Sequence, residues 1–588
     1  MSPSWEEPGR EGADVEGELR DDMLIEWDVP IEMDDGVVLR ADVFRPADVA
    51  GCPVLLSHGP YGKGLAFQDG YPEQWGILLG EHPEVGARSS GRYQGWEVAD
   101  PETWVPEGYA CVRVDSRGAG RSPGFLDPFS ARETQDFYLC IEWAGTRSWS
   151  NGRVGLLGIS YYAINQWLVA ARQPPHLAAI CPWEGAADWY RDMTHHGGIL
   201  CTFWENWYRR QVMTVQHGLG RRGETSRATG QLVSGPETIS ERGLEESRAA
   251  LGEDVRAHRL DGTYHRERSA EWEKVMVPLL SAANWGGQGL HARGNFEGFV
   301  RAASQEKWLE VHGLEHWTEF YTTYGLSLQR RFFDHFLKGE DNGWGDQPPV
   351  QLQVRTMDGF VERAEREWPI RRTRWMRLYL DPGRLSLRTA PLGEEASVSY
   401  RALGEGVTFW GAPLEEETEV TGPLAARLFV SGQDTDVDLF LVVRVFDPQG
   451  EEVVFQGALD PHTPVAQGWL RASQRRLDQD LSTAWRPYHR HDRIESLVPG
   501  ETYQLEVEIW PTSIVMPAGY RLALSVRGRD YEHAGAGTGL ATFANVMRGC
   551  GPFLHDDPED RSPPAVGGEV TLHSGGGRDA YLLLPVVP

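Results

Sequence analysis

The stretch 154–166 (VGLLGISYYAINQ) constrains the fold of this 588-residue chain more than any other. It begins with an apolar run that suits a buried strand, turns sharply around Gly158 and Ser160, and becomes helical in character from Ala163. A strand, a tight turn and a helix with a serine at the apex are typical of a nucleophile elbow. Gly158 leaves room for the turn, and the backbone N–H of Tyr161 points to where an oxyanion would form.

The turn departs from the simple G-x-S-x-G pattern, because Tyr162 stands where a second glycine is expected. The first small residue after the serine is Ala163. An ordinary strand-to-helix loop that happens to carry a serine therefore remains an alternative for this stretch taken alone.

Strand-like apolar runs alternate with helical segments around this turn, which predicts an α/β domain with a mainly parallel sheet. In such sheets the functional residues lie at the carboxyl ends of the strands. Tyr61, Ser160 and Glu184 all follow strand ends, so we expect them on one rim of the sheet. The strand-like runs are 54–57, 110–115, 154–157, 177–181, 277–283 and 308–312.

Two segments break this alternation. Residues 186–277 are rich in Trp, Arg and Glu and predict a helical insertion that caps the rim. After a linker at Pro348-Pro349, short alternating segments separated by turn residues continue to the end of the chain. That pattern predicts an antiparallel β-sandwich domain.

Composition and charge exclude several functional classes. The apolar content of 40% and the charged content of 24% are those of a soluble globular protein. A net charge of −29 argues against binding to nucleic acid or to anionic membranes, which require basic patches. No stretch is long and apolar enough to span a bilayer.

The cysteines and the first residues predict a cytoplasmic protein. The six cysteines are scattered and include no CxxC pair and no zinc spacing, so we expect free thiols in a reducing compartment. The acidic first residues show no basic or apolar region of a secretory signal. The sequence leaves open whether the chain forms a homo-oligomer.

Several motifs together resemble the cocaine esterase, X-Pro dipeptidyl-peptidase and glutaryl acylase superfamily, the CocE/NonD serine hydrolases. The resemblance covers nearly the whole chain. It implies an α/β-hydrolase core in two parts (1–185 and 278–345), a helical cap (186–277) and a jelly-roll β-sandwich (346–588). It also implies hydrolysis of esters or amides through an acyl-enzyme. The motifs are Gly59-Pro-Tyr61, Asp115-Ser-Arg-Gly-Ala-Gly-Arg-Ser122, Ile141-Glu-Trp143, Trp149-Ser-Asn-Gly-Arg-Val-Gly155, Gly158-Ile-Ser-Tyr161, Leu314-Glu-His316 and Asp434-Thr-Asp-Val-Asp438.

Ser160 is the candidate nucleophile, and its hydroxyl needs a base to take the proton. In α/β-hydrolases that base is a histidine after the last strand. His316 has this position and matches the family's histidine, whereas His312 lies at the strand end itself. The segment also spells H-x-x-E-H, a zinc-protease signature, but that motif requires a helix and Gly313 follows a strand-like run.

The triad acid is where the chain departs from the family. Gly287 occupies the place of the usual aspartate, which follows Asn284-Trp285. A histidine base still requires a carboxylate to fix its tautomer. Glu184, at the end of a neighbouring strand, is the best substitute, and Asp188 and Glu297 are weaker candidates.

The resemblance makes Tyr61 an oxyanion donor together with the N–H of Tyr161. Trp183, Trp285 and Trp317 are expected to line an aromatic substrate pocket, and the alternative is that they belong to the core.

The resulting prediction is a serine hydrolase of a small ester or amide, with no metal and no organic cofactor. An X-Pro dipeptidyl-peptidase and a catalytically inactive binding protein are the alternatives.

Overall fold

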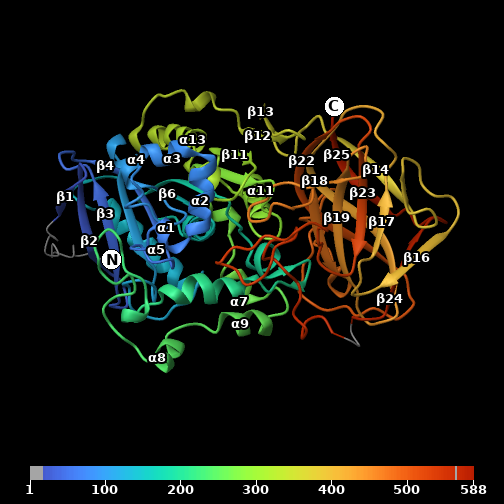
Figure 1. Cartoon of the computed structure of the whole chain (residues 1–588), viewed down its shortest axis with the longest axis horizontal. Helices are drawn as coiled ribbons and strands as arrows, with labels where there is room; N and C mark the ends of the chain where they lie inside the picture. The colour runs from blue at the N-terminus through green and yellow to red at the C-terminus, as the bar shows by residue number, and fades with distance from the viewer. Residues whose placement is uncertain (1–16, 563–565) are drawn as a thin grey trace, which may run out of the picture.

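An eleven-stranded mixed sheet organises the N-terminal part of the chain (Figure 1). The structure is a computed structural model that describes residues 17–562 and 566–588. Across the sheet the strand order is β1-β2-β3-β5-β4-β6-β7-β10-β11-β12-β13. The run from β5 to β12 in that order is parallel, and the outer pairs are antiparallel. The strands are β1 (Glu18–Arg20), β2 (Met23–Glu32), β3 (Val38–Arg45), β4 (Cys52–Gly59), β5 (Ala110–Asp115), β6 (Ser150–Ile159), β7 (Leu177–Trp183), β10 (Leu279–Asn284), β11 (Lys307–His312), β12 (Val350–Arg355) and β13 (Phe360–Glu365).

The predicted α/β fold class is confirmed. The strand-like runs fall on β4, β5, β6, β7, β10 and β11. These strands are buried on both faces, which is why they read as continuous apolar runs. Because they are parallel, their carboxyl ends share one edge of the sheet.

Helices cover both faces of this sheet, and β6 shows how its side chains divide between them. Val154 and Leu156 belong to the same apolar cluster as Trp167 of α6, whereas Leu157 belongs to the cluster of Phe333 in α13. This is the two-residue alternation of a strand. The helices are α1 (Phe67–Gly70), α2 (Pro72–Glu81), α3 (Pro83–Arg88), α4 (Pro101–Trp104), α5 (Ala131–Gly145), α6 (Tyr161–Ala170), α11 (Ala292–Arg301), α12 (Thr318–Tyr321) and α13 (Thr323–Phe333).

The insertion between β7 and β10 leaves the sheet and runs along one side of it (Figure 1). Its α-helices are only four to seven residues long and are joined by irregular segments. A small hairpin precedes them. The elements are β8 (His195–His196), β9 (Ile199–Leu200), α7 (Phe203–Trp207), α8 (Glu241–Glu246), α9 (Leu251–Ala257) and α10 (Thr263–Arg266).

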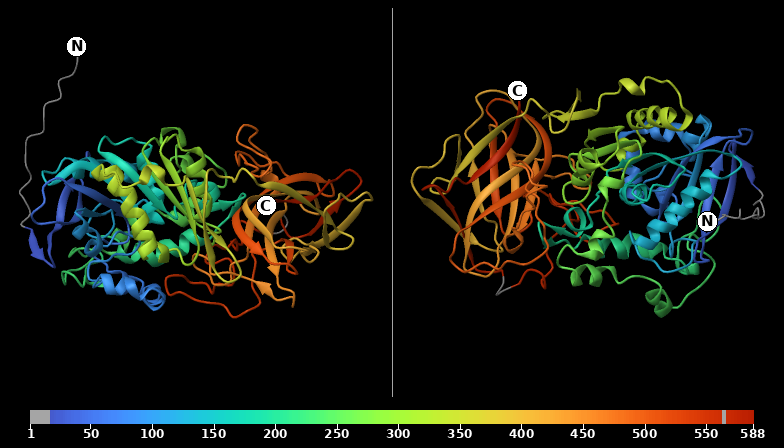
Figure 2. Two further views of the ribbon diagram at one scale, coloured as in Figure 1. Left: turned by 90° about the horizontal axis from the view of Figure 1, so that it is seen from above. Right: turned by 180° about the vertical axis from the view of Figure 1, so that it is seen from behind.

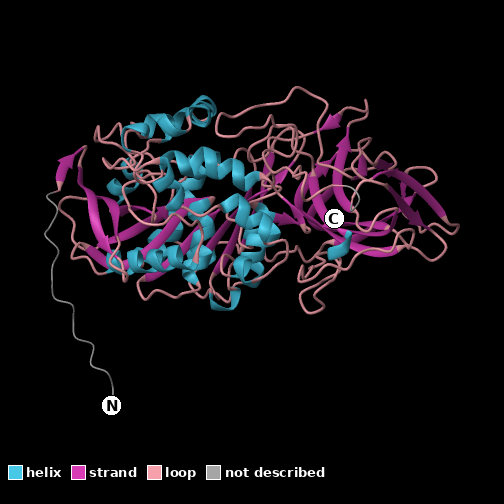
Figure 3. Cartoon of the chain, turned by 90° about the horizontal axis from the view of Figure 1, so that it is seen from below, coloured by secondary structure: helices cyan, strands magenta, loops and turns pink. Residues whose placement is uncertain are grey.

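The C-terminal part is a β-domain that lies beside the α/β part (Figures 2 and 3). Its strands surround one apolar core, and the longest pairing joins β18 to β22. The strands are β14 (Arg374–Asp381), β15 (Ser386–Arg388), β16 (Ala396–Arg401), β17 (Val407–Trp410), β18 (Thr418–Gly432), β19 (Asp438–Phe446), β20 (Glu452–Val453), β21 (Ala466–Arg471), β22 (Tyr503–Met516), β23 (Arg521–Arg527), β24 (Glu569–Ser574) and β25 (Tyr581–Val587).

The boundary between the two parts differs from the sequence expectation. Strands β12 and β13 still belong to the first sheet, which therefore continues to Glu365 rather than ending at residue 345. A shared apolar cluster joins the parts, with Trp285 and Phe296 from the α/β side and Trp469 and Trp510 from the β-domain. Burial of these large side chains fixes the two parts against each other.

All six cysteines are buried and free of disulfide bonds. Within residues 17–562 and 566–588, no helix combines the length and the apolar character that a membrane crossing requires.

Candidate active site

Ser160 occupies the sharp turn between β6 and α6. Its backbone has φ 53° and ψ −111°, an unusual conformation for a residue with a side chain. Gly158 allows the turn, because a Cβ at that position would lie 2.4 Å from the Cβ of Tyr162. The structure therefore has the strand–turn–helix geometry that the sequence predicts, with the Ser160 hydroxyl in a pocket.

The histidine in contact with Ser160 is His291, the residue before α11. Its Nε2 lies 3.1 Å from the Ser160 Oγ. Burial lowers the pKa of His291 well below its ordinary value, and the neighbouring His316 lowers it further. The ring is therefore neutral at pH 7, and its Nε2 can accept the serine proton.

His316 lies one ring further from the serine. It stacks on His291 with 5.4 Å between ring centroids, and its Nε2 lies 2.9 Å from Oε1 of Glu97. Burial disfavours the charged ring, but the hydrogen bond and the charge of Glu97 outweigh it and raise the pKa of His316. Burial raises the pKa of Glu97 to about 7, against the opposing influence of His316. Among the described contacts, His316 makes no hydrogen bond to Ser160.

Glu184 is buried and pairs with a different histidine from the one that the sequence suggests. Its Oε1 lies 2.9 Å from Nε2 of His312 and 3.2 Å from Nδ2 of Asn284. The other nitrogen of His312 lies 2.7 Å from Glu310. Burial opposes the charge on this ring, yet Glu310 and Glu184 raise the pKa of His312 to about 10. In the described contacts, Glu184 therefore hydrogen-bonds His312, and it makes no hydrogen bond to His316.

The two weaker acid candidates are also engaged elsewhere. Asp188 forms an ion pair of 2.9 Å with Arg191, and Glu297 lies 2.7 Å from Arg486. Each carboxylate neutralises a guanidinium, so neither hydrogen-bonds a histidine near Ser160 in the described part of the chain.

Tyr61 and Tyr161, the first residue of α6, line the same pocket as Ser160. Nε1 of Trp207 donates a hydrogen bond of 2.9 Å to the Tyr61 hydroxyl. An indole nitrogen only donates, so the phenol keeps its own proton for a further acceptor. Burial raises the pKa of Tyr61 well above 10, as does Glu97, so the phenol stays protonated. The N–H of Tyr161 is among the first four of the helix, which have no intrahelical acceptor.

Ser160, His291, Tyr61 and Tyr161 line one pocket, and its wall is mainly aromatic. The tryptophans that line it are Trp96, Trp204 and Trp207. The three tryptophans that the sequence suggests do not line it. Trp183 stacks on His312, Trp285 belongs to the cluster between the two parts, and Trp317 packs behind Trp96.

Comparison with known proteins identifies the family. The model for X-Pro dipeptidyl-peptidase (S15 family) matches residues 35–318, and that for the X-Pro dipeptidyl-peptidase C-terminal non-catalytic domain matches residues 342–582. The crystal structure of a CocE/NonD family hydrolase from Staphylococcus aureus is 33% identical, with a TM-score of 0.81 over 96% of this chain and 94% of that one. This chain belongs to the CocE/NonD family.

Named relatives of this CocE/NonD protein are esterases and peptidases. Cocaine esterase from Rhodococcus sp. is 24% identical over 86% of this chain and 90% of that enzyme. A putative serine esterase from Mycobacterium tuberculosis is 26% identical over 88% of this chain and 92% of its own length. The family and these relatives show that the chain is a serine hydrolase.

The departure at Gly287 lies directly beside His291 in this CocE/NonD protein. A Cβ at 287 would be 3.3 Å from the His291 Cβ, and the Gly287 carbonyl accepts a hydrogen bond from the His291 N–H. Gly287 thus borders the histidine that contacts Ser160. His291 has no predicted role in the sequence analysis. The signal that could have identified it is its place four residues after Gly287.

The segment after β11 does not support the zinc-protease alternative. Residues 313–317 are not helical, and Leu314 has a positive φ of 68°. His312 and His316 point to different carboxylates, Glu184 and Glu97. Two histidines that bind one metal from a helix would share a face. Glu97 itself lies on an irregular segment between α3 and α4, where no sequence motif marks it.

Proposed function

We propose that this serine hydrolase cleaves a small, uncharged ester or amide that carries an apolar or aromatic group, through an acyl-enzyme on Ser160. The observation that carries the proposal is the 3.1 Å contact between Ser160 Oγ and His291 Nε2 in an aromatic pocket. A buried neutral histidine in that position is suited to act as a general base.

The proposed reaction has two balanced halves. Ser160 Oγ attacks the substrate carbonyl carbon while His291 Nε2 takes the hydroxyl proton, and the carbonyl oxygen becomes an oxyanion. The Tyr61 hydroxyl and the Tyr161 N–H stabilise that charge. The leaving alcohol or amine departs with the proton from His291. Water then attacks the acyl-enzyme and gives one proton to His291. As the acid leaves, His291 returns that proton to Ser160 Oγ, and both residues regain their starting states.

His316 and Glu97 act in this proposal as a positioning pair behind the base. The His316 ring stacks on His291, and the hydrogen bond to Glu97 holds it there. In this proposal the pair, with Glu97 bonded to His316 and not to His291, takes over the positioning role of the aspartate that the family resemblance expects at 287. His316 as the base itself, as the sequence predicts, is the competing assignment, and single variants of the two histidines distinguish them.

The pocket favours esters over peptides with a free amino terminus. Among the residues that line it, Glu97 is the one carboxylate, and it is paired with His316. An X-Pro dipeptidyl-peptidase needs an acidic group that holds the substrate ammonium. The aromatic wall instead offers stacking and apolar contact.

Two measurements test the proposal. Labelling with a fluorophosphonate should modify wild-type chain and leave Ser160→Ala unmodified, whereas absence of labelling would favour an inactive binding protein. A panel of p-nitrophenyl esters and aminoacyl-Pro anilides should show higher kcat/KM for esters with aromatic acyl groups. Preference for the anilides would transfer the assignment to the peptidase class.

The buried free thiols support a reducing compartment, and we propose the cytoplasm. The net charge of −29 supports a small-molecule substrate over nucleic acid or an anionic membrane surface.

A further inference from the structure

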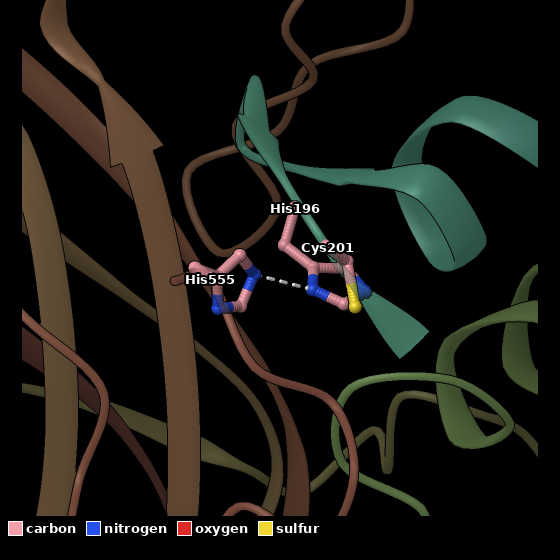
Figure 4. Close-up of side chains that lie close together, drawn as sticks. All are labelled: His196, Cys201 and His555. Atoms are coloured by element: carbon pink, nitrogen blue, oxygen red, sulfur yellow. Dashed lines mark hydrogen bonds between the residues drawn. The ribbon is translucent and has the colours of Figure 1, made fainter. Parts of the chain in front are cut away.

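Three metal-ligating side chains converge where the insertion meets the β-domain (Figure 4). His196 comes from β8, Cys201 follows β9, and His555 comes from the loop between β23 and β24. Their ligand atoms all lie within 4.8 Å of one another, and all three residues are buried. The sequence showed no zinc spacing because the third ligand is hundreds of residues away from the first two.

The far side of each imidazole is held by an acceptor. His196 Nε2 lies 3.2 Å from the carbonyl oxygen of Asp192, and His555 Nδ1 lies 2.8 Å from a carboxylate oxygen of Asp530. A carbonyl oxygen can only accept, so His196 carries its proton on Nε2. This leaves the Nδ1 lone pair of His196 aimed at the centre of the cluster. Histidines that bind metals are oriented in this way by a carbonyl or a carboxylate behind them.

We propose that His196 Nδ1, His555 Nε2 and Cys201 Sγ bind one zinc ion, with water in the fourth position. Imidazole and thiolate suit Zn²⁺, which takes such ligands in a tetrahedral arrangement. Binding releases the thiol proton of Cys201. The ion's two positive charges are then balanced by the thiolate and by the Asp530 carboxylate behind His555, so the buried site is neutral overall.

The distance between the two rings indicates what zinc would change. His196 Nδ1 and His555 Nε2 are 2.8 Å apart in this structure. Two nitrogens on a tetrahedral zinc with bonds of 2.0–2.1 Å lie about 3.3 Å apart, so the rings separate slightly on binding. The alternative without metal is a direct hydrogen bond between the two rings.

A zinc ion at this site would hold residues next to the substrate pocket in place. Phe203 and Phe553 each lie two residues from a ligand, and their rings pack 5.0 Å apart. Phe203 lines the pocket, and Phe553 meets His291 edge-on at 6.5 Å. The N–H of Thr202 also donates to the Leu554 carbonyl at 2.8 Å. Zinc would therefore tie the insertion to the β-domain beside the pocket and stabilise the chain, without taking part in the hydrolysis.

The test uses the full chain stripped of metal and titrated with Co²⁺, which reports a thiolate ligand by a charge-transfer absorption in the near ultraviolet. We expect a stoichiometric band that Zn²⁺ removes by displacement, and a rise in Tm when Zn²⁺ is added. Cys201→Ala and His555→Gln should lose the band and the Tm response. Cys181→Ala, which removes a buried free thiol on β7, should keep both.

If wild-type chain shows no thiolate-to-cobalt band and no Tm rise with Zn²⁺, the zinc proposal is wrong. His196 and His555 are then joined only by their hydrogen bond. A band that persists in Cys201→Ala would also overturn it. The wild-type titration needs no variant to fold, and its outcome does not depend on whether the proposed esterase activity is found.

Discussion

His291 and His316 stack with 5.4 Å between their ring centroids, but only His291 hydrogen-bonds Ser160. Glu97 holds the second ring at 2.9 Å from its Nε2. The two histidines therefore differ in proton affinity as well as in position, since burial lowers the pKa of His291, whereas Glu97 raises the pKa of His316 despite its burial. This difference makes the assignment of the base experimentally accessible.

Ser160→Ala should abolish ester hydrolysis and leave the fold intact, because the hydroxyl faces the pocket and alanine fits the same turn. The expected outcome is loss of turnover with an unchanged circular dichroism spectrum and Tm. Hydrolysis near the wild-type rate in the purified variant would remove Ser160 from the mechanism.

His291→Ala should lower kcat by about 10²- to 10⁴-fold, the usual contribution of a general base. His316→Ala is the matched control, because it removes a buried ring of the same size that does not contact Ser160. We expect a smaller loss of kcat in that variant. The reverse order, with the greater loss at 316, would restore His316 as the base. Steady-state kinetics on one p-nitrophenyl ester suffice.

The pH dependence of kcat/KM should separate the same two histidines. A base must be unprotonated, and the lowered pKa of His291 means that it loses this form only well below its ordinary value of 6.5. Activity should therefore persist as the pH falls through 6.5. If His316 were the base, its raised pKa would place the acid limb above 6.5.

Glu97 faces His316 and titrates near pH 7, so its own ionisation can shape the same profile. Glu97→Gln removes that titration and is the control. Glu97→Gln also removes the group that raises the pKa of His316. An acid limb that lies below 6.5 in the wild-type chain and does not move in this variant therefore supports His291, whereas a limb above 6.5 in both proteins contradicts the assignment.

Tyr61→Phe should reduce kcat by about 100- to 1000-fold with little change in KM, because the phenol hydrogen bond matters mainly once the oxyanion forms. The hydroxyl already accepts from Trp207, which leaves its proton free for the substrate oxygen. An unchanged kcat would limit Tyr61 to shaping the turn. Trp207→Phe keeps an aromatic ring in the wall but removes the donor to the Tyr61 hydroxyl, so it measures the contribution of that hydrogen bond.

Glu184→Gln should destabilise the chain and change kcat less than tenfold, since its described partners are His312 and Asn284. Removing one member of a buried charged pair typically costs about 3 to 5 kcal/mol. Urea unfolding would measure this loss. A fall in kcat on the order of 10⁴ would instead be the result for a triad acid, and it would reinstate the sequence-based assignment.

The fold class, the elbow and the family could all be predicted from the amino-acid sequence. Continuous apolar runs predict strands that are buried on both faces, as in a parallel sheet. The turn depends on neighbouring residues, chiefly Gly158 and Ser160. The motif combination sufficed for a serine hydrolase. Strands and turns of this kind can be predicted because they depend on residues that are close together in the sequence.

The side chains that meet at the serine could not be predicted from the sequence. His291, Glu97 and the pocket tryptophans come from loops and an insertion whose paths depend on packing between distant segments. Trp183 and Trp207 look alike in sequence, yet one packs against His312 in the core and the other donates to Tyr61. Glu184 follows a strand end on the expected rim, but the nearest histidine in space is His312. Hydrogen-bond partners across such distances are fixed by the packing of the whole core, and periodicity and motif spacing carry no information about them.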